Sequence, residues 1–150
     1  MSADPPVDPR GPRFAAWVTT AVLALVLVTG WWPLLAAQAV VFAAGALIGL
    51  HVAPYSLVYR YLIAPRLPPA TEREDAAPLR FAQGLGFGFA LVGTLGYATG
   101  LTTLGIVATA LALAAAFLNA AFAFCLGCEA YLLIRRVSPT INPTKERALR

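Results

Sequence analysis

The sequence predicts an all-α membrane protein in which four transmembrane helices form two hairpins. The first observation is the distribution of charge, since no Lys, Arg, Asp or Glu lies between Phe14 and Tyr59 or between Phe81 and Cys128. The second is composition: 59% of the 150 residues are hydrophobic and only 12% are charged, against about a quarter in an average soluble domain. Each uncharged block is long enough for two spans of roughly 20 residues and a tight turn.

The expected elements follow from these blocks in chain order. Residues 1–12, rich in Pro and Asp, should be a disordered cytoplasmic tail. A transmembrane domain at 13–136 holds the four predicted helices, at 13–29, 33–51, 80–97 and 102–134, and a second cytoplasmic tail covers 137–150. At 1.5 Å per residue the fourth helix would be about 48 Å long. Its last turns must therefore tilt, bend or leave a hydrocarbon core of roughly 30 Å.

Between the second and third helices, the stretch Pro54–Pro65 is too short to span a membrane. It mixes tyrosines and Arg60 with aliphatic residues. This pattern indicates a short helix lying at the membrane interface. A continuation of the second helix, kinked at Pro54, fits it equally well.

The basic residues set the expected orientation. All 11 Lys and Arg flank the apolar spans on one side, and none lies in the turns near Gly30 and Gly100. The positive-inside rule therefore places both termini and the central loop in the cytoplasm. Nucleic acid is excluded as a partner, because these residues do not form a basic stripe with interleaved aromatics. The lipid bilayer is the expected partner.

A short sequence is repeated at the start of the first and third helices. Arg13-Phe14-Ala15 and Arg80-Phe81-Ala82 both stand at the predicted cytoplasmic edge. A duplication of one hairpin would explain the repeat, with the halves related by an axis along the membrane normal. The alternative, which the sequence favours, is that Arg followed by an aromatic residue is a frequent interface anchor.

The only cysteines, Cys125 and Cys128, are the main candidates for chemistry. At a spacing of three they share one helical face, close enough for a disulfide, so they are predicted as a redox pair. Their expected place near the end of a long helix disfavours a thiolate, because the helix dipole is negative there. The alternatives are that both cysteines fill space between helices, or that they bind a metal together with His51 and Glu129. That four-residue set is a weak alternative, so no metal is predicted.

Three further polar residues are singled out in the apolar segments. His51 is a candidate proton shuttle for the thiols, although a histidine at an interface is often only a hydrogen-bonded residue. Asn119 and Gln83 are predicted to be structural, with Asn119 bridging helices through its amide. No phosphate-binding loop or nucleotide-binding turn is present, and no cofactor is predicted.

The segments "DPRGPRFAAW", "LRFAQG" and "FLNAAFAFCLGCEAYLLIRR" resemble a family of small bacterial membrane proteins, the domain of unknown function 4395 (DUF4395). The resemblance covers about residues 8–136. It implies an integral protein of the bacterial plasma membrane, loosely linked to thioredoxin-like and sulfurtransferase proteins as possible partners. Its motif positions in this chain are Asn119, Cys125, Cys128 and Glu129.

The resulting functional hypothesis is a thiol–disulfide or sulfur-relay component of the membrane. In it, one cysteine attacks a partner's disulfide or carries a persulfide, and the other resolves it. Two alternatives stay open: a non-enzymatic scaffold or assembly subunit, and a small transporter. A transporter is disfavoured because no charge lies within the spans. The residues do not decide whether the protein is an enzyme.

Overall fold

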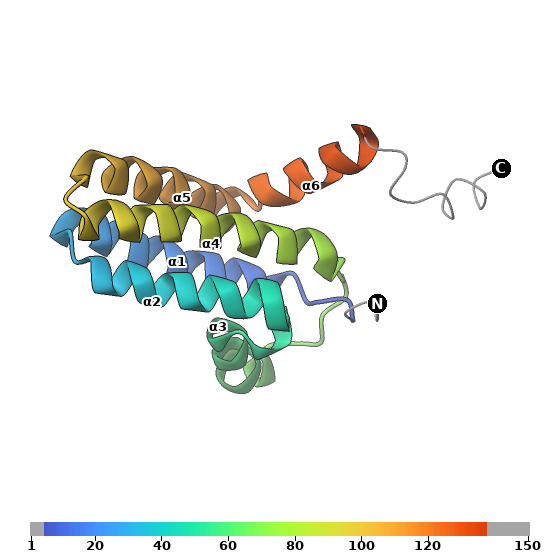
Figure 1. The fold of residues 1–150 in the computed structure, drawn as a ribbon. Helices are drawn as coiled ribbons and strands as arrows, with labels where there is room; N and C mark the ends of the chain where they lie inside the picture. Colours follow the sequence, from blue (N-terminus) through green and yellow to red (C-terminus); the bar gives the residue numbers. More distant parts are fainter. Residues whose placement is uncertain (1–4, 138–150) are drawn as a thin grey trace.

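The computed structural model describes residues 5–137, and its architecture is a helical bundle (Figure 1). Its four main helices are α1 (Arg10–Thr29), α2 (Trp32–Ala43), α4 (Ala76–Ala98) and α5 (Thr102–Phe122). The turns α1–α2 and α4–α5 lie at the same end of the bundle (Figure 1). No strand occurs within 5–137, where one isolated bridge joins Val7 to Glu74. The all-α prediction is confirmed.

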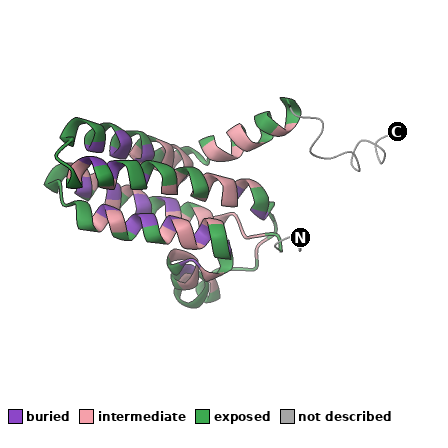
Figure 2. Cartoon of the chain, viewed as in Figure 1, coloured by how far each residue is buried: buried purple, intermediate pink, exposed green. Residues whose placement is uncertain are grey.

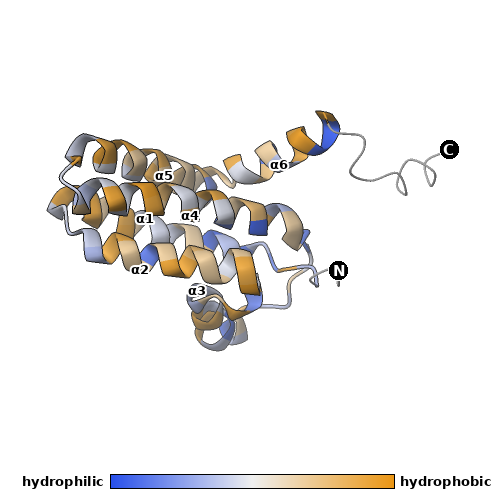
Figure 3. Cartoon of the chain, viewed as in Figure 1, coloured by the Kyte–Doolittle hydropathy of each residue, from blue (hydrophilic) through white to orange (hydrophobic). Residues whose placement is uncertain are grey.

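The lengths and surfaces of the helices are those of a membrane protein. α1, α4 and α5 are long and apolar enough to cross a membrane, whereas α2 with its π-helical extension η1 (Ala44–Ile48) forms a shorter apolar helix. Buried residues line the inside of the bundle, while orange, hydrophobic residues also cover its outside (Figures 2 and 3). Val28 and Leu47, for example, are 85% and 79% exposed. A water-soluble bundle would instead carry charged side chains on that face.

Small residues allow α4 and α5 to approach closely near their connecting turn. A Cβ atom built on Gly96 would lie 2.6 Å from the backbone nitrogen of Gly105. Small residues thus let the two backbones come together here, as is common between membrane helices. Further along α4, Gly88 faces open space, so it does not serve the same purpose.

The second helix ends earlier than predicted. Its helical backbone stops at Ile48, because Gly49 has φ = +143°, a conformation that side chains strongly disfavour. The break therefore lies at Gly49, neither at His51 nor at Pro54. The chain continues through four short helical segments: η2 (Leu50–Val52), α3 (Pro54–Val58), η3 (Tyr59–Ile63) and η4 (Ala64–Arg66). α3 and η3 pack against α1.

The predicted fourth helix, 102–134, is two helices. α5 ends at Phe122, and α6 (Leu126–Val137) starts in a new direction and packs mainly on α4 (Figure 1). The reversal occurs at Ala123, which adopts the left-handed conformation with φ = +54°. The length of the predicted helix already required its last turns to tilt, bend or leave the membrane core. No residue marked Ala123 as the break, because alanine is an excellent helix former and rarely ends a helix this way.

The first helix begins before its predicted start. α1 starts at Arg10 rather than 13, and Val7 exchanges two backbone hydrogen bonds of 2.9 Å with Glu74. This pairing orders part of the segment that was predicted as a disordered tail. α4 likewise begins at Ala76, where the Asp75 side chain caps the helix by accepting from the Ala77 N–H. Residues 1–4 and 138–150 lie outside the described part of the chain, and with them most of the second predicted tail.

The repeated Arg-Phe-Ala sequence makes equivalent contacts in the two halves of the chain. Arg13 of α1 donates to the Ala120 carbonyl near the end of α5, and Arg80 of α4 donates to the Ala46 carbonyl near the end of η1. In the same way Phe14 contacts the Tyr59 ring, and Phe81 contacts the Tyr131 ring. The helix pairing agrees, since α1 packs on α5 and α2 on α4. The repeat thus marks equivalent structural positions and is more than an interface anchor.

Candidate functional site

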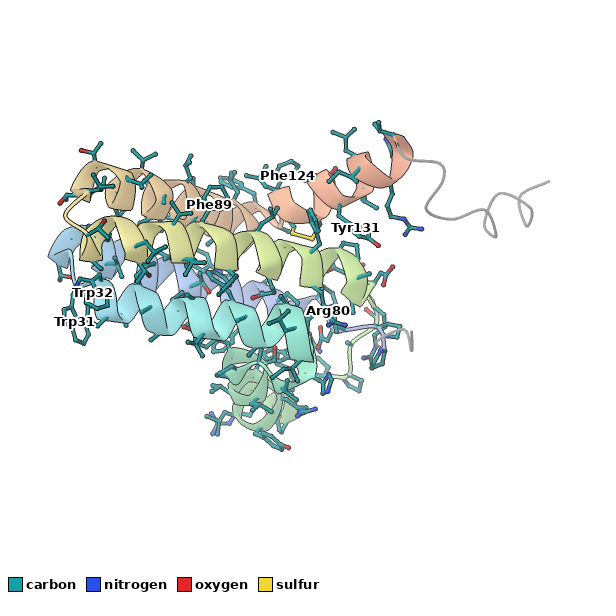
Figure 4. All side chains as sticks on the ribbon, viewed as in Figure 1. Trp31, Trp32, Arg80, Phe89, Phe124 and Tyr131 are labelled. Atoms are coloured by element: carbon teal, nitrogen blue, oxygen red, sulfur yellow. A yellow bond between two sulfur atoms is a disulfide. The ribbon has the colours of Figure 1, made fainter. Side chains whose placement is uncertain are left out.

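The two cysteines lie at the start of α6. Cys125 immediately precedes the helix, and its carbonyl accepts the Glu129 N–H at 3.0 Å, so it occupies the N-cap position. The Cys128 N–H donates to Cys125 Sγ over 3.2 Å. The two Cα atoms are 5.1 Å apart and the sulfur atoms lie at disulfide distance. Figure 4 shows the sulfurs at the first turn of α6, facing α4.

The position of Cys125 at a helix N-terminus reverses the effect of the helix dipole that the sequence predicted. The sequence placed the pair near the C-terminal end of a helix, where the dipole destabilises a thiolate. In the structure Cys125 caps the N-terminus of α6, where free N–H groups and the positive end of the dipole favour negative charge. A helix N-terminus is one of the environments that lower the pKa of reactive cysteines. The cysteine pair therefore lies at the beginning of a helix.

Backbone and side-chain contacts fix the break before the cysteines. The N–H groups of Ala123 and Phe124 fold back onto the Asn119 and Leu118 carbonyls, at 3.1 and 3.2 Å. The Arg13 guanidinium donates to the Ala120 carbonyl at 3.2 Å. A cation at the C-terminal end of a helix satisfies a free carbonyl and complements the helix dipole. α1 thus helps to end α5 just ahead of the cysteines.

Close packing on α4 holds the pair in place. A Cβ built on Gly127 would lie 2.5 Å from the Ala82 Cβ, so only glycine permits this approach. Both cysteines are half-buried, and they pack against the buried residues Leu50, Ala76 and Leu79. One side of the pair therefore faces the interior of the bundle.

A large, partly open cavity runs between the helices and is lined in part by Cys125. Its volume is about 720 Å³, and most of its lining is apolar. All four main helices contribute to the wall, together with α3 and the start of α6, including Cys125. Small side chains create much of the space, and α1 and α5 contribute several of them: Ala15, Ala16, Ala112, Ala115 and Ala116.

A buried hydrogen-bond network borders this cavity near the middle of the bundle. Gln38 is 2% exposed, and its Oε1 accepts from the Tyr55 hydroxyl at 2.6 Å. Its Nε2 lies 3.5 Å from Thr19 Oγ1, to which it donates. The sequence did not identify this network as part of the site. The available signal was a lone amide within an apolar span, which must find a partner.

The other predicted site residues occupy different parts of the cavity wall. Asn119 and Gln83 both line it, and within residues 5–137 neither side chain makes a hydrogen bond. The interhelical bridge predicted for Asn119 is therefore not formed. His51 also lines the cavity, but its exposed imidazole makes no hydrogen bond with either cysteine. Its role as a proton shuttle stays a prediction, and Glu129 is exposed on α6.

The described part of the chain holds no group of three or more His, Cys, Asp or Glu side chains arranged to bind a metal. The alternative set of Cys125, Cys128, His51 and Glu129 is thus not assembled in this structure.

A charged cluster stands where the cavity meets the start of α1. The Arg10 guanidinium donates to both carboxylate oxygens of Asp8, and the Tyr59 hydroxyl donates to Asp8 Oδ2 at 3.1 Å. The hydrogen bond from Arg10 is the main reason that the pKa of Asp8 lies below its ordinary value. Burial, together with the bond to Asp8, raises the pKa of Tyr59.

Comparison with known proteins identifies the family. The family described as "Domain of unknown function (DUF4395)" matches residues 7–136, which include all six α-helices nearly completely. The chain belongs to this family, as its resemblance in sequence predicted. No curated protein and no solved structure matches the chain.

Proposed function

We propose that this DUF4395 member is a membrane component of thiol–disulfide exchange, with Cys125 and Cys128 as its redox pair. The observation that carries the proposal is the position of Cys125 as the N-cap of α6, with its sulfur accepting the Cys128 N–H. A thiolate formed there gains a hydrogen bond and a favourable dipole. Cys128 stands at disulfide distance, so it can resolve a mixed disulfide.

We further propose that α1, α2 with η1, α4 and α5 each cross the plasma membrane of a bacterium, as two hairpins. The 17 residues Trp32–Ile48 are at the lower limit of length for a span. Trp31 and Trp32 lie at the end of the bundle opposite Arg80 (Figure 4), which suits an outer aromatic belt and a cytoplasmic basic edge. Both termini and the cysteine pair then face the cytoplasm.

The exchange reaction starts from the reduced protein, in which Cys125 and Cys128 are both thiols. The Cys125 thiolate attacks a partner's disulfide, which forms a mixed disulfide and releases one partner thiolate. Cys128, after losing its proton, attacks Cys125 Sγ, which closes the Cys125–Cys128 disulfide and releases the second partner thiol. The partner is thereby reduced and the pair oxidised, and the reverse sequence oxidises the partner. His51 would accept or supply the proton if it moves toward Cys125.

A thioredoxin-like protein is the partner that this chemistry favours, because it offers a dithiol or disulfide at the cytoplasmic face. A sulfurtransferase could instead place a persulfide on Cys125. With Cys128 at disulfide distance, its attack on the inner persulfide sulfur would release sulfide and again form the disulfide. The arrangement therefore supports exchange better than storage of sulfane sulfur.

Thiol trapping tests the proposal. Inverted vesicles and intact cells would be treated with reductant or oxidant and then with a membrane-impermeant maleimide. We expect labelling from the cytoplasmic side that disappears on oxidation. In the Cys128→Ser variant, Cys125 should accumulate a mixed disulfide with a thioredoxin-like protein, whereas Cys125→Ser should not. Thiols that stay reduced over the whole glutathione range would disprove the redox role, and labelling from the outside would disprove the orientation.

A further inference from the structure

We propose that the interior cavity binds a membrane quinone, and that this quinone accepts two electrons from the Cys125–Cys128 dithiol. The inference rests on the proposed function and deepens it, since it sets the direction of exchange: the protein would oxidise the thiols of its partner. Three features of the structure carry it, namely the continuity of the cavity with Cys125, its lining, and its relation to the lipid-facing surface.

The cavity joins the sulfur site to the centre of the bundle. Cys125 and its neighbours Leu126 and Gly127 form part of the wall, and Thr19 and Gln38 form another part in the middle of the bundle. Its volume of about 720 Å³ lies within the range of roughly 300–1,000 Å³ that holds small-molecule ligands. A ligand in this space can therefore lie against Cys125.

The lining fits a neutral ring that carries hydrogen-bond acceptors. Apolar side chains from α2 and α4 such as Phe42 and Phe89 form much of the wall. The amides of Asn119 and Gln83 line it without a hydrogen-bond partner in residues 5–137. Amide N–H groups in this position would donate to carbonyl oxygens, which a quinone supplies and a hydrocarbon chain lacks. The charged wall residues, such as Asp8 and Arg73, belong to segments outside the main helices.

An apolar ligand also has a route from the lipid. Leu85 and Phe89 of α4 and Leu111 of α5 line the cavity, and all three are exposed, Leu111 by 53%. Leucine side chains can change rotamer within nanoseconds when exposed. A lipid-soluble electron carrier is therefore the class of oxidant that this cavity admits.

The redox step balances with the quinone as oxidant. Two S–H bonds break at Cys125 and Cys128, and the S–S bond between them forms. The two electrons pass to the quinone ring, and the two protons end on its two oxygens, which yields a quinol. The disulfide then oxidises a partner dithiol by exchange, and the cycle repeats with another quinone.

The test uses the full-length purified protein in detergent, reduced and freed of reductant. Decylubiquinone is the probe, because its ring is fully substituted and thiols do not add to it. Oxidation of the pair is followed by loss of maleimide labelling, and quinol formation by absorbance. Exchange of the same preparation with glutathione disulfide is measured in parallel. That second assay depends on the cysteines alone and checks the proposed function.

A matched pair of variants separates the cavity from the cysteines. Ala115 lines the cavity, whereas its neighbour Ala114 is exposed and lies outside the lining. Ala115→Phe should slow reduction of decylubiquinone by roughly tenfold or more through steric exclusion. Ala114→Phe should leave it unchanged, and both variants should keep exchange with glutathione. Asn119→Leu should raise the KM for decylubiquinone about fivefold, the effect of one lost hydrogen bond.

The outcomes distinguish the two proposals. Absent exchange with glutathione disproves the redox pair and the quinone site together. Normal exchange with glutathione but no quinol disproves the quinone site alone. Equal rates of quinol formation in Ala115→Phe and Ala114→Phe disprove it too. In either case an acyl chain would be the ligand that the cavity holds. If Ala115→Phe also loses exchange with glutathione, Asn119→Leu decides, since an unchanged KM for decylubiquinone would overturn the quinone site.

Discussion

The two halves of the chain share one framework and differ in what they place at one position. In each half, two main helices are followed by a break and a short helix that packs back on the first of the two. The contact between Phe14 and Tyr59 corresponds to that between Phe81 and Tyr131. Aligning the two tyrosines gives the register between α3 and α6. The N-cap of α3, Ala53, then stands opposite the N-cap of α6, which is Cys125.

In the same register, the residues of α3 and α6 that stand opposite each other differ, and this gives the two short helices different surroundings. Ser56 stands opposite Cys128, so the first half has no thiol at either redox position. Tyr55 stands opposite Gly127. The glycine lets α6 touch α4, whereas the tyrosine extends into the cavity and donates to Gln38. The backbone framework thus offers an N-cap site in both halves, and the side chains decide that only the second half carries a pair of cysteines there.

Among the substitutions that test this comparison of the two halves, Gly127→Ala should change the free energy of unfolding most. The added Cβ would meet the Ala82 Cβ at 2.5 Å and its Cα at 2.6 Å, and the backbone cannot move aside cheaply. We expect a loss of about 1–3 kcal/mol in the free energy of unfolding, the usual cost of overpacking. α6 should also shift and change the rate at which maleimide labels Cys125.

The matched control is Gly88→Ala on α4, where a Cβ meets nothing within 4 Å. That variant should be neutral or stabilised by up to about 1 kcal/mol, because alanine favours the helix. Equal stability losses in the two variants would contradict the tight contact between α4 and α6.

Substitution of Arg13 or Arg80, which both donate to carbonyls at helix ends, should cost less stability than Gly127→Ala. The losses in the two variants should be of similar size. Arg13→Met and Arg80→Met remove guanidinium hydrogen bonds to helix-end carbonyls: one to Ala120 in the first variant, and three to Ala46 and Leu47 in the second. We expect each to lower the free energy of unfolding by about 1 kcal/mol. Only Arg13→Met should also increase labelling of Cys125, since Arg13 holds the end of α5 just before the cysteines. Faster labelling in Arg80→Met alone would show that the caps do not correspond as described.

The smallest effect concerns a contact that only the first half makes. Tyr59 donates to Asp8, whereas its counterpart Tyr131 packs under the Arg135 guanidinium. Because the pKa of Asp8 is below its ordinary value of 3.8, the carboxylate stabilises the fold above that pH. This contribution should disappear as the pH falls through the lowered pKa. Thermal unfolding between pH 5 and pH 2, compared with Asp8→Asn, measures it, and identical pH dependence would contradict the cluster.

Sequence patterns predicted the fold better than they predicted its interruptions. Long uncharged blocks identify apolar helices because each residue adds to the same signal, and the turns at Gly30 and Gly100 were placed correctly. The break at Gly49 had a weak signal, since glycine occurs often in membrane helices. The excess length of the predicted fourth helix indicated a bend but not its position, because the left-handed conformation of Ala123 is held by hydrogen bonds to the preceding turn and by Arg13.

The same break limits what could be predicted about the site. The spacing of Cys125 and Cys128 allowed a pair at disulfide distance whether or not the helix continued. Whether the dipole opposes or favours a thiolate depended on whether one helix continued through the cysteines or ended before them. The break after Phe122 places the pair at the start of α6 and so changes the sign of the effect. The cavity could not be predicted at all, since it is the space left between alanines of separate helices.

The sequence by itself determined the class of the protein, its apolar helices and the identity of the two thiols. These depend on composition and on residues close together in the chain. Only the tertiary structure decided that Cys125 begins a helix, that Gly127 fits against Ala82 and that Cys125 lines a cavity between the helices. Each of these results from contacts between helices distant in sequence, because packing selects among backbone conformations that local preferences leave nearly equal in free energy.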